Sequence, residues 1–233
     1  MQVPNSKTPI QRCETASKFA QDAMRRYPTF FKPEPEVAAR LENLAGSLGV
    51  GTGALMSAQG GYRAAVIDLI PHRVAVKLSD LRSAEVVRSV KRAADDAGAE
   101  ISEAVFPGGI EPIIKPFGQT EVDELRKLEG RIAAATSWAD RTAQLARIVE
   151  VRELYEKALK DRKDAMMAAA GQRAVRDSVK EDFLDVFATV AAAIKGEFPR
   201  DKKRQDVFFD KLRAKKTAVD DDDDDADDSD DEG

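Results

Sequence analysis

A long series of aliphatic and small residues at helical spacing, between Val37 and Leu69, constrains the fold of this chain more than any other feature. Successive members stand three or four positions apart, which is the spacing of one face of an α-helix and not of a β-strand. The members are Val37, Leu41, Leu44, Leu48, Gly51, Leu55, Ala58, Tyr62, Val66 and Leu69. A helix with such a face is not stable alone in water. Helices of similar length, from this chain or from a second copy, must therefore cover it.

Six glycines lie within the same helix, and each costs about 0.5–1 kcal/mol relative to alanine in a helix interior. They are Gly46, Gly49, Gly51, Gly53, Gly60 and Gly61. Two interpretations remain open: the helix is flexible or broken near residues 49–53, or the missing side chains let a neighbouring helix approach closely. A phosphate-binding loop is not favoured, because no apolar strand precedes the glycines and no Lys-Ser or Lys-Thr follows them.

The composition agrees with helices that pack through aliphatic side chains. Of the 233 residues, 42% are hydrophobic, only 6% are aromatic and 34% are charged. We predict an all-α fold: an antiparallel bundle of about four long helices with coiled-coil-like packing. The predicted organisation is a short N-terminal helix and connector at 1–32, the bundle at 33–199, a basic amphipathic segment at 200–219 and a disordered acidic tail at 220–233.

The N-terminal segment contains a helix start and a helix stop. Thr8 followed by Pro9 and Gln11 predicts a capping box with Thr8 as N-cap. The helix is expected to bury Phe19 and to end near Arg26, since the residue before a proline avoids helical angles and Pro28 follows. Two phenylalanines in the connector, Phe30 and Phe31, are then expected to close one end of the bundle.

Proline and glycine also divide the predicted bundle into its helices. Pro71 is expected to end or kink the first long helix, and a second is expected from near Ser79. The core face of this second helix is predicted to be Leu81, Ala84, Val87, Val90, Ala94, Ala97, Ile101 and Val105. Residues 106–119 are rich in proline and glycine but also in isoleucine, which predicts a loop that closes the core, with a ligand-binding loop as the alternative.

The second half of the bundle is predicted to consist of two more helices. Thr120 has the character of an N-cap, and no strong breaker follows before Ala170. We expect one continuous or mildly kinked helix over this range, although a break near residues 136–138 is an alternative. Gly171 is expected to provide the turn into the last helix, which Phe198-Pro199 closes.

The charge of the chain is strongly asymmetric. Residues 220–232 hold eleven acidic residues and no basic one, whereas the rest carries 31 acidic against 37 basic residues, a net charge of +6. Residues 200–216 hold eight basic and three acidic residues around an apolar cluster, which predicts a short basic amphipathic helix. The acidic tail could screen this basic segment, bind a basic partner or only keep the protein in solution.

No combination of residues in the sequence predicts catalysis. His72 is the only histidine, so a di-iron carboxylate site has too few ligands, and a zinc site lacks ligands in the same way. Cys13 is the only cysteine, and we interpret it as a buried structural thiol. A lone cysteine also agrees with a reducing compartment, and no long apolar run is present, so a cytoplasmic location without membrane contact is predicted.

We therefore predict a non-enzymatic helical protein, without cofactor or metal, that acts as a protein–protein interaction or assembly module, with self-association as one form. The alternative is a nucleic-acid-binding protein regulated by its acidic tail. An enzyme with a small-molecule pocket beneath residues 106–119 is the third hypothesis. Basic residues are the candidate contacts to a partner or to nucleic acid: Arg82, Arg88, Lys91, Arg92, Lys202, Lys203, Arg204, Lys211, Arg213, Lys215 and Lys216.

Overall fold

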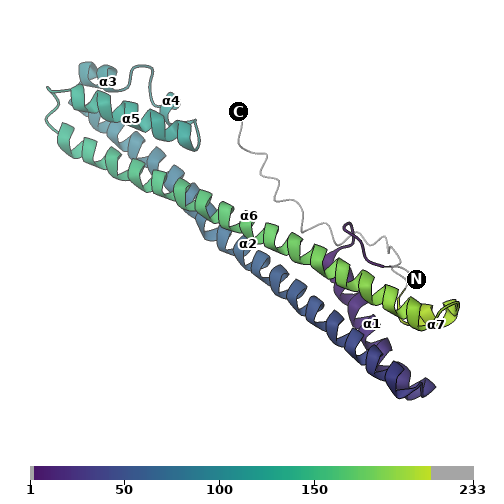
Figure 1. Ribbon diagram of the computed structural model, residues 1–233. Coiled ribbons are helices and arrows are strands. Elements are labelled where there is room, and N and C mark those ends of the chain that lie inside the picture. The colour runs from purple at the N-terminus through teal and green to yellow at the C-terminus, as the bar shows by residue number, and fades with distance from the viewer. Residues whose placement is uncertain (1–2, 211–233) are drawn as a thin grey trace. The chain divides into compact units, whose positions relative to one another are not determined.

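The structure, a computed structural model, describes residues 3–210 of the chain. Seven α-helices lie in this range (Figure 1): α1 (Ile10–Phe31), α2 (Pro35–Ala97), α3 (Ala99–Val105), α4 (Glu111–Ile114), α5 (Gln119–Ala134), α6 (Arg141–Glu197) and α7 (Lys202–Val207). The same residues contain no β-strand, and the all-α prediction is confirmed. The predicted acidic tail at 220–233 and the end of the basic segment lie outside the described residues.

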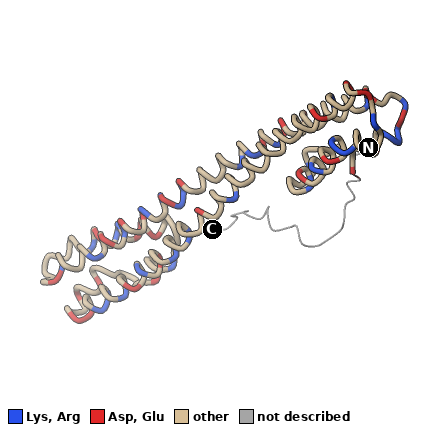
Figure 2. The backbone as a smooth tube through the Cα atoms, turned by 90° about the horizontal axis from the view of Figure 1, so that it is seen from below, with Lys and Arg blue, Asp and Glu red and all other residues tan. Residues whose placement is uncertain are grey.

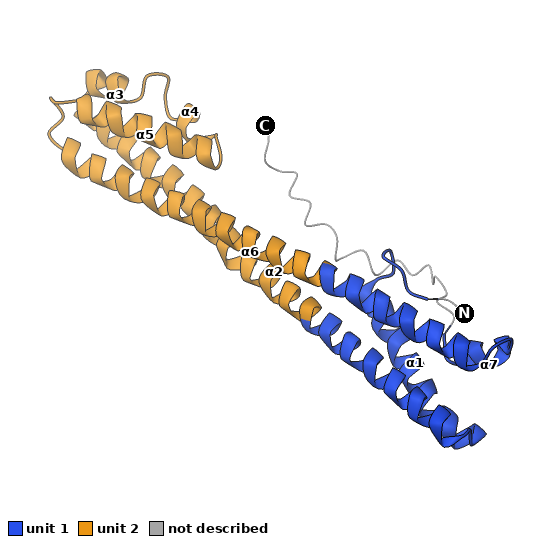
Figure 3. Cartoon of the chain, viewed as in Figure 1, with its two compact units in different colours: residues 1–57, 178–233 blue, residues 58–177 orange. Residues whose placement is uncertain are grey.

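The chain forms two compact units (Figure 3). Unit 1 combines residues 1–57 with residues 178–233, and unit 2 consists of residues 58–177. Two helices contribute to both units, because α2 contains the boundary at 57/58 and α6 contains the boundary at 177/178. Unit 1 is therefore assembled from the two ends of the sequence, whereas unit 2 is one uninterrupted stretch.

Unit 1 packs α1, the first part of α2, the last part of α6 and α7 around one apolar core. The buried members are Ile10, Cys13, Ala16, Ala20, Met24, Tyr27, Leu41, Ala45, Leu48, Leu55, Phe183, Phe187, Val190, Ala191, Ile194, Phe198, Phe208 and Phe209. Arg40 near the start of α2 pairs with Glu197 at the end of α6 at 3.1 Å, so the two helices run antiparallel here. A buried hydrogen bond of 2.6 Å between the hydroxyls of Ser17 and Thr52 fixes α1 against α2.

Unit 2 packs α3, α4 and α5 against the second part of α2 and the first part of α6. The buried members of its core are Val76, Val87, Val90, Ala94, Val105, Phe106, Ile113, Val122, Leu125, Leu128, Ile132, Trp138, Ile148, Tyr155 and Ala158. Helix α5 contacts both α3 and α4. The predicted loop at 106–119 contains α4, and it supplies Phe106 and Ile113 to this core.

The predicted turn at Gly171 is wrong, and Pro71 does not end a helix, because α6 and α2 continue through these residues. Residues 3–210 therefore contain two very long helices, of 63 and 57 residues, in place of the predicted four or so long helices. Leu69 and Val76 stand seven residues apart on either side of Pro71; Val76 is buried in the core of unit 2, and Leu69 is partly buried. A break at Pro71 would disrupt this apolar face, and one helical glycine at 171 costs only about 1 kcal/mol.

The expected continuous helix over residues 120–170 is also wrong. Helix α5 ends at Ala134 and α6 begins at Arg141, so the break falls where the alternative interpretation placed it, around residues 136–138. Trp138 is buried in the connection, at 3% exposure, and joins the core of unit 2. Helix α5 begins one residue before the predicted N-cap Thr120, and Gly118, with φ of 68°, precedes it.

The predictions for the N-terminal helix need three corrections. Thr8 does not cap α1, since its hydroxyl instead accepts a hydrogen bond of 2.9 Å from the backbone N–H of Asn5. Pro28 lies inside α1, which ends at Phe31 and is followed by Lys32 in the left-handed region. Phe19 is 41% exposed and, with Phe30 and Phe31, belongs to the exposed aromatic residues, so these phenylalanines do not close the core.

The glycines of α2 do not break the helix, and two of them permit close approach. A Cβ atom at Gly49 would lie 3.2 Å from Oε1 of Gln21, and one at Gly61 would lie 3.0 Å from Oε1 of Gln172. At three other positions no atom lies within 4 Å of an added Cβ: Gly46, Gly53 and Gly60. The close-approach interpretation therefore applies to only part of the series.

Candidate functional site

A row of large aliphatic side chains is exposed on α2 within unit 2. We call it the outward stripe; its members, with their exposed fractions, are Ile67 (65%), Ile70 (54%), Val74 (48%), Leu78 (60%) and Leu81 (54%). They stand three, four, four and three residues apart. At about 100° per residue all five fall within about 80° of the helix circumference, so they form one continuous row.

The opposite face of α2 is the one that packs inside unit 2. Val76 is 1% exposed, and Leu69 and His72 are partly buried, about half a turn from the outward stripe. Helix α2 is therefore apolar on two opposite faces between residues 67 and 81. A helix of this kind is normally covered on both sides in a folded protein. The outward stripe thus has the character of a binding surface.

Charged residues of opposite sign stand at the two ends of the outward stripe. Arg63 lies four residues before Ile67 and Glu85 lies four residues after Leu81, and both are exposed. The helical spacing places both side chains on the same face as the stripe.

The four predicted basic contacts on α2 do not form one basic face. Arg82 pairs with Glu150 of α6 at 3.2 Å, and Lys91 pairs with Asp95 at 2.5 Å. Arg88 and Arg92 are exposed. At about 100° per residue the four residues spread over about half of the helix circumference. Figure 2 shows that residues of both charge signs are interspersed along the described helices.

The remaining predicted basic contacts belong to unit 1. Lys202, Lys203 and Arg204 are exposed on α7, which is followed by the buried Phe208 and Phe209. Arg204 pairs with Asp201 at 3.2 Å, and its backbone N–H is capped by the same carboxylate. The last four candidates lie outside the described residues: Lys211, Arg213, Lys215 and Lys216.

Unit 2 also contains a buried polar cluster around Glu121. Glu121 is 1% exposed, and one of its oxygens contacts the hydroxyl of Ser83, whereas the other is buried without a hydrogen-bond partner. The Ser83 hydroxyl lies 2.9 Å from the backbone carbonyl oxygen of Asp80. Tyr155 lies beside the cluster, and its hydroxyl oxygen accepts a hydrogen bond of 2.9 Å from the backbone N–H of Gly118.

The environment of Glu121 favours the protonated carboxyl group. The pKa of Glu121 is raised from 4.5 to about 8, with burial as the largest cause; the nearby Asp80 carboxylate adds to the rise, and the Ser83 and Tyr155 hydroxyls oppose it. The hydrogen bonds of Ser83 agree with a protonated Glu121. The Ser83 hydroxyl has one hydrogen to donate, but it contacts two oxygens, the Asp80 carbonyl oxygen and Oε1 of Glu121. If the Glu121 hydroxyl donates to Ser83 Oγ, Ser83 can donate to the Asp80 carbonyl, and both contacts are satisfied.

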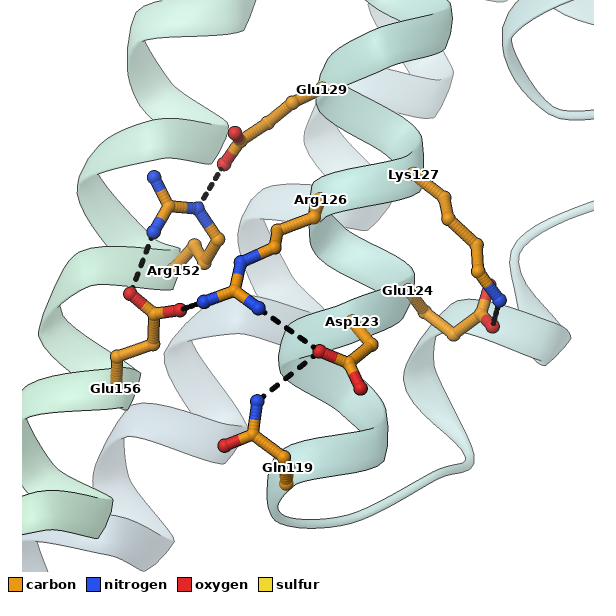
Figure 4. A network of polar contacts seen from close by, with 8 residues as sticks. All are labelled: Gln119, Asp123, Glu124, Arg126, Lys127, Glu129, Arg152 and Glu156. Atoms are coloured by element: carbon orange, nitrogen blue, oxygen red, sulfur yellow. Dashed lines mark hydrogen bonds and ion pairs between the residues drawn. The ribbon is translucent and has the colours of Figure 1, made fainter.

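A network of ion pairs joins α5 to α6 at the surface of unit 2 (Figure 4). Arg152 of α6 donates to Glu129 of α5 at 2.5 Å and to Glu156 at 2.7 Å. Arg126 of α5 also pairs with Glu156. Arg152 is the least exposed of these side chains, at 14%, and it lies between two carboxylates. We interpret this network as structural, because every charged group in it has a partner within it.

Other features of the described residues do not suggest a catalytic site. A surface hollow of about 230 Å³ in unit 1 is lined by Arg40, Leu41, Asn43, Leu44, Ser47, Ala193 and Glu197. Among residues 3–210, no group of three or more potential ligands is placed to hold a metal ion. Within the same range, no helix combines the length and apolar character that crossing a membrane requires. Cys13 is buried, as predicted.

The sequence contained the signal for the outward stripe, but it was assigned differently. Leu81 was predicted to begin a core face and is instead 54% exposed, whereas Val87 and Val90 of that predicted face are buried. The row from Ile67 to Leu81 crosses Pro71, where the sequence predicts a helix end or a kink, and a helix end there would place its members on two separate helices.

Comparison of the chain with protein-family models, curated proteins and solved structures finds no match. The features of this chain that bear on function are the outward stripe, the charges beside it and the packing of α2.

Proposed function

We propose that the protein is a non-enzymatic assembly module that binds a helical partner through the outward stripe of α2. The observation that carries this proposal is the exposure of five large aliphatic side chains, each 48–65% exposed, on a helix whose other face is already packed. Burying a side chain of this kind contributes about 1.5–3 kcal/mol when complete, so covering the row offers a substantial driving force.

The spacing of the stripe favours a helix as the bound element. Residues three and four apart along one face are the pattern by which helices pack together in coiled coils and in helix-in-groove complexes. Within unit 2, α2 would present this row to the partner while its opposite face packs in the core of the unit. Coiled-coil-like packing between partner and stripe is part of the proposal.

Nucleic-acid binding is less well supported by the geometry. Binding to a phosphate backbone depends on basic side chains that neutralise phosphates and release their counterions. Two of the four candidate residues on α2 already pair with carboxylates: Arg82 with Glu150 and Lys91 with Asp95. Those pairs reduce the positive potential that a phosphate backbone would meet. Crosslinking to nucleic acid is therefore an alternative outcome of the experiment below.

Site-specific photo-crosslinking tests the proposal. A benzophenone amino acid replaces Leu78 in the full chain, and a matched variant carries it at Val50, which is 77% exposed on the same helix within unit 1. We expect adducts with one protein, identified by mass spectrometry, from position 78 and not from position 50. Absence of adducts at 78, equal labelling at both positions, or adducts sensitive to nuclease and not to protease would refute the proposal.

A further inference from the structure

We propose that the partner is a second copy of this chain, whose outward stripe packs antiparallel against the first about a two-fold axis at Val74. This inference rests on the proposed function and specifies the partner. It concerns only residues 63–85 of α2, all of which belong to unit 2.

The stripe has the symmetry that such a pair requires. Its spacing of three, four, four and three residues is the same read from either end, with Val74 at the centre. In an antiparallel pair centred there, Ile67 lies opposite Leu81 of the other copy and Ile70 lies opposite Leu78. Every member therefore meets another member, which is the self-complementarity of a two-fold interface.

The charges at the ends of the stripe are complementary in the same register. Arg63 stands eleven residues before Val74 and Glu85 stands eleven residues after it. The antiparallel arrangement therefore places Arg63 of each copy opposite Glu85 of the other, twice in the pair. A parallel arrangement would place arginine opposite arginine and glutamate opposite glutamate, which costs free energy. Arg63 and Glu85 therefore favour the antiparallel direction over the parallel one.

The oligomeric state of the full chain is the first test. A single helix face makes a small interface, so we expect a dissociation constant in the micromolar range. Sedimentation equilibrium should show the mass rising with concentration from 25.5 kDa toward twice that value. Val74→Asp places two carboxylates on the axis and should keep the chain monomeric, whereas Val50→Asp should behave as the unsubstituted chain. A mass of 25.5 kDa up to submillimolar concentration, or association that persists in Val74→Asp, would overturn the inference.

Disulfide trapping tests the direction independently of any folding defect. With oxidised glutathione as oxidant, Val74→Cys should form a linked dimer, because the two residues meet on the axis. Leu81→Cys alone should not, since its two copies would be about 21 Å apart along the helices, far beyond the roughly 4.4–6.8 Å Cα separation of a disulfide. Mixed Ile67→Cys and Leu81→Cys chains should link. Equal linking at 74 and 81 would indicate a parallel pair and refute this register. The unsubstituted chain, with Cys13 buried, is the control.

Charge reversal tests the register through the two polar ends. Arg63→Glu and Glu85→Arg should each raise the dissociation constant about five- to tenfold, since each brings two like-charged pairs together. The double variant should restore the original affinity within about twofold, because both pairs reform with reversed polarity. A double variant as weak as the sum of the two single changes would refute the register.

The two proposals fail differently. If the chain is monomeric in sedimentation while position 78 crosslinks to another identified protein, self-pairing is wrong and the proposed function stands. If position 78 gives no adduct and the chain is monomeric, both are wrong. A stripe-dependent adduct of twice the chain mass supports both.

Discussion

Replacement of Glu121 by glutamine should convert a pH-dependent stability into a nearly constant one. Glu121 is buried, and its pKa in the folded protein is about 8, against 4.5 when it is not perturbed. The folded state therefore keeps a proton that the unfolded chain releases above pH 4.5. Glutamine has almost the same shape and stays neutral, and its amide can donate to Ser83 Oγ in place of the carboxyl hydroxyl.

The sign and size of the effect follow from proton linkage. Because the folded state binds more protons than the unfolded state between pH 4.5 and 8, the free energy of unfolding falls as pH rises through this interval and is level outside it. One pKa unit corresponds to 1.36 kcal/mol, so Glu121 destabilises the fold by about 3 kcal/mol at pH 7 and by about 5 kcal/mol above pH 8. Glu121→Gln should recover most of this difference at neutral pH and little near pH 4.5.

Urea unfolding at several pH values measures the difference directly. Trp138, the only tryptophan, is buried in unit 2 with Glu121, so its fluorescence follows the unit that contains the substitution. Glu103→Gln, which removes an exposed carboxyl group of α3, controls for the change in net charge. A stability gain for Glu121→Gln that is the same at pH 5 and pH 8, or a loss at pH 8, would refute the reasoning.

Three further predictions concern packing. Arg152→Ala should destabilise unit 2 by about 1–3 kcal/mol in urea unfolding, because the carboxylates of Glu129 and Glu156 lose the arginine between them. Arg126→Ala, at a 54% exposed position, should cost less than about 1 kcal/mol. Gly53→Ala should stabilise the protein by about 0.5–1 kcal/mol in thermal unfolding. Gly61→Ala should stabilise it less, because the added Cβ atom meets the side chain of Gln172. Equal stabilisation by the two variants would contradict the geometry. Burial raises the pKa of Cys13, so a thiol reagent should label it only after denaturation, and rapid labelling of the native protein would contradict its burial.

Helical periodicity predicted which residues fill the cores where one helix face is apolar. Leu41, Leu48 and Leu55 of the first apolar series are buried, and so are Leu125 and Leu128 of α5. These positions were predictable because apolar residues recur every three or four positions along one face of each helix. The all-α class followed from the same pattern.

Helix boundaries were not predictable from local signals alone. Pro71 removes one backbone hydrogen bond and disfavours helical angles at Ile70, yet α2 continues through it, and Val76, five residues later, is buried in the core of unit 2. The break before α6 shows the opposite case. No proline or glycine marks it, and burial of Trp138 accompanies it. Packing between distant segments decided both, and a single sequence does not contain that information.

The candidate site was missed for a related reason. Between residues 67 and 81 α2 is apolar on two faces, and periodicity alone does not tell which face is covered. Glu121 stands in the first turn of α5, a position where the helix dipole favours an acid and which is often exposed, but here Ser83 and Tyr155 of two other helices lie beside it and it is buried. Both features depend on which helices become neighbours.

The division of α2 and α6 between two units has a consequence for synthesis on the ribosome. Unit 2 is complete once residue 177 has emerged, so it can fold while the rest of the chain is still being made. Leu41, Leu48 and Leu55 emerge long before Phe183 and Phe187, which share their core. Until those partners arrive, α1 is the only described part of unit 1 that can shield these leucines, and the nascent chain is most exposed to chaperones and to aggregation in this interval.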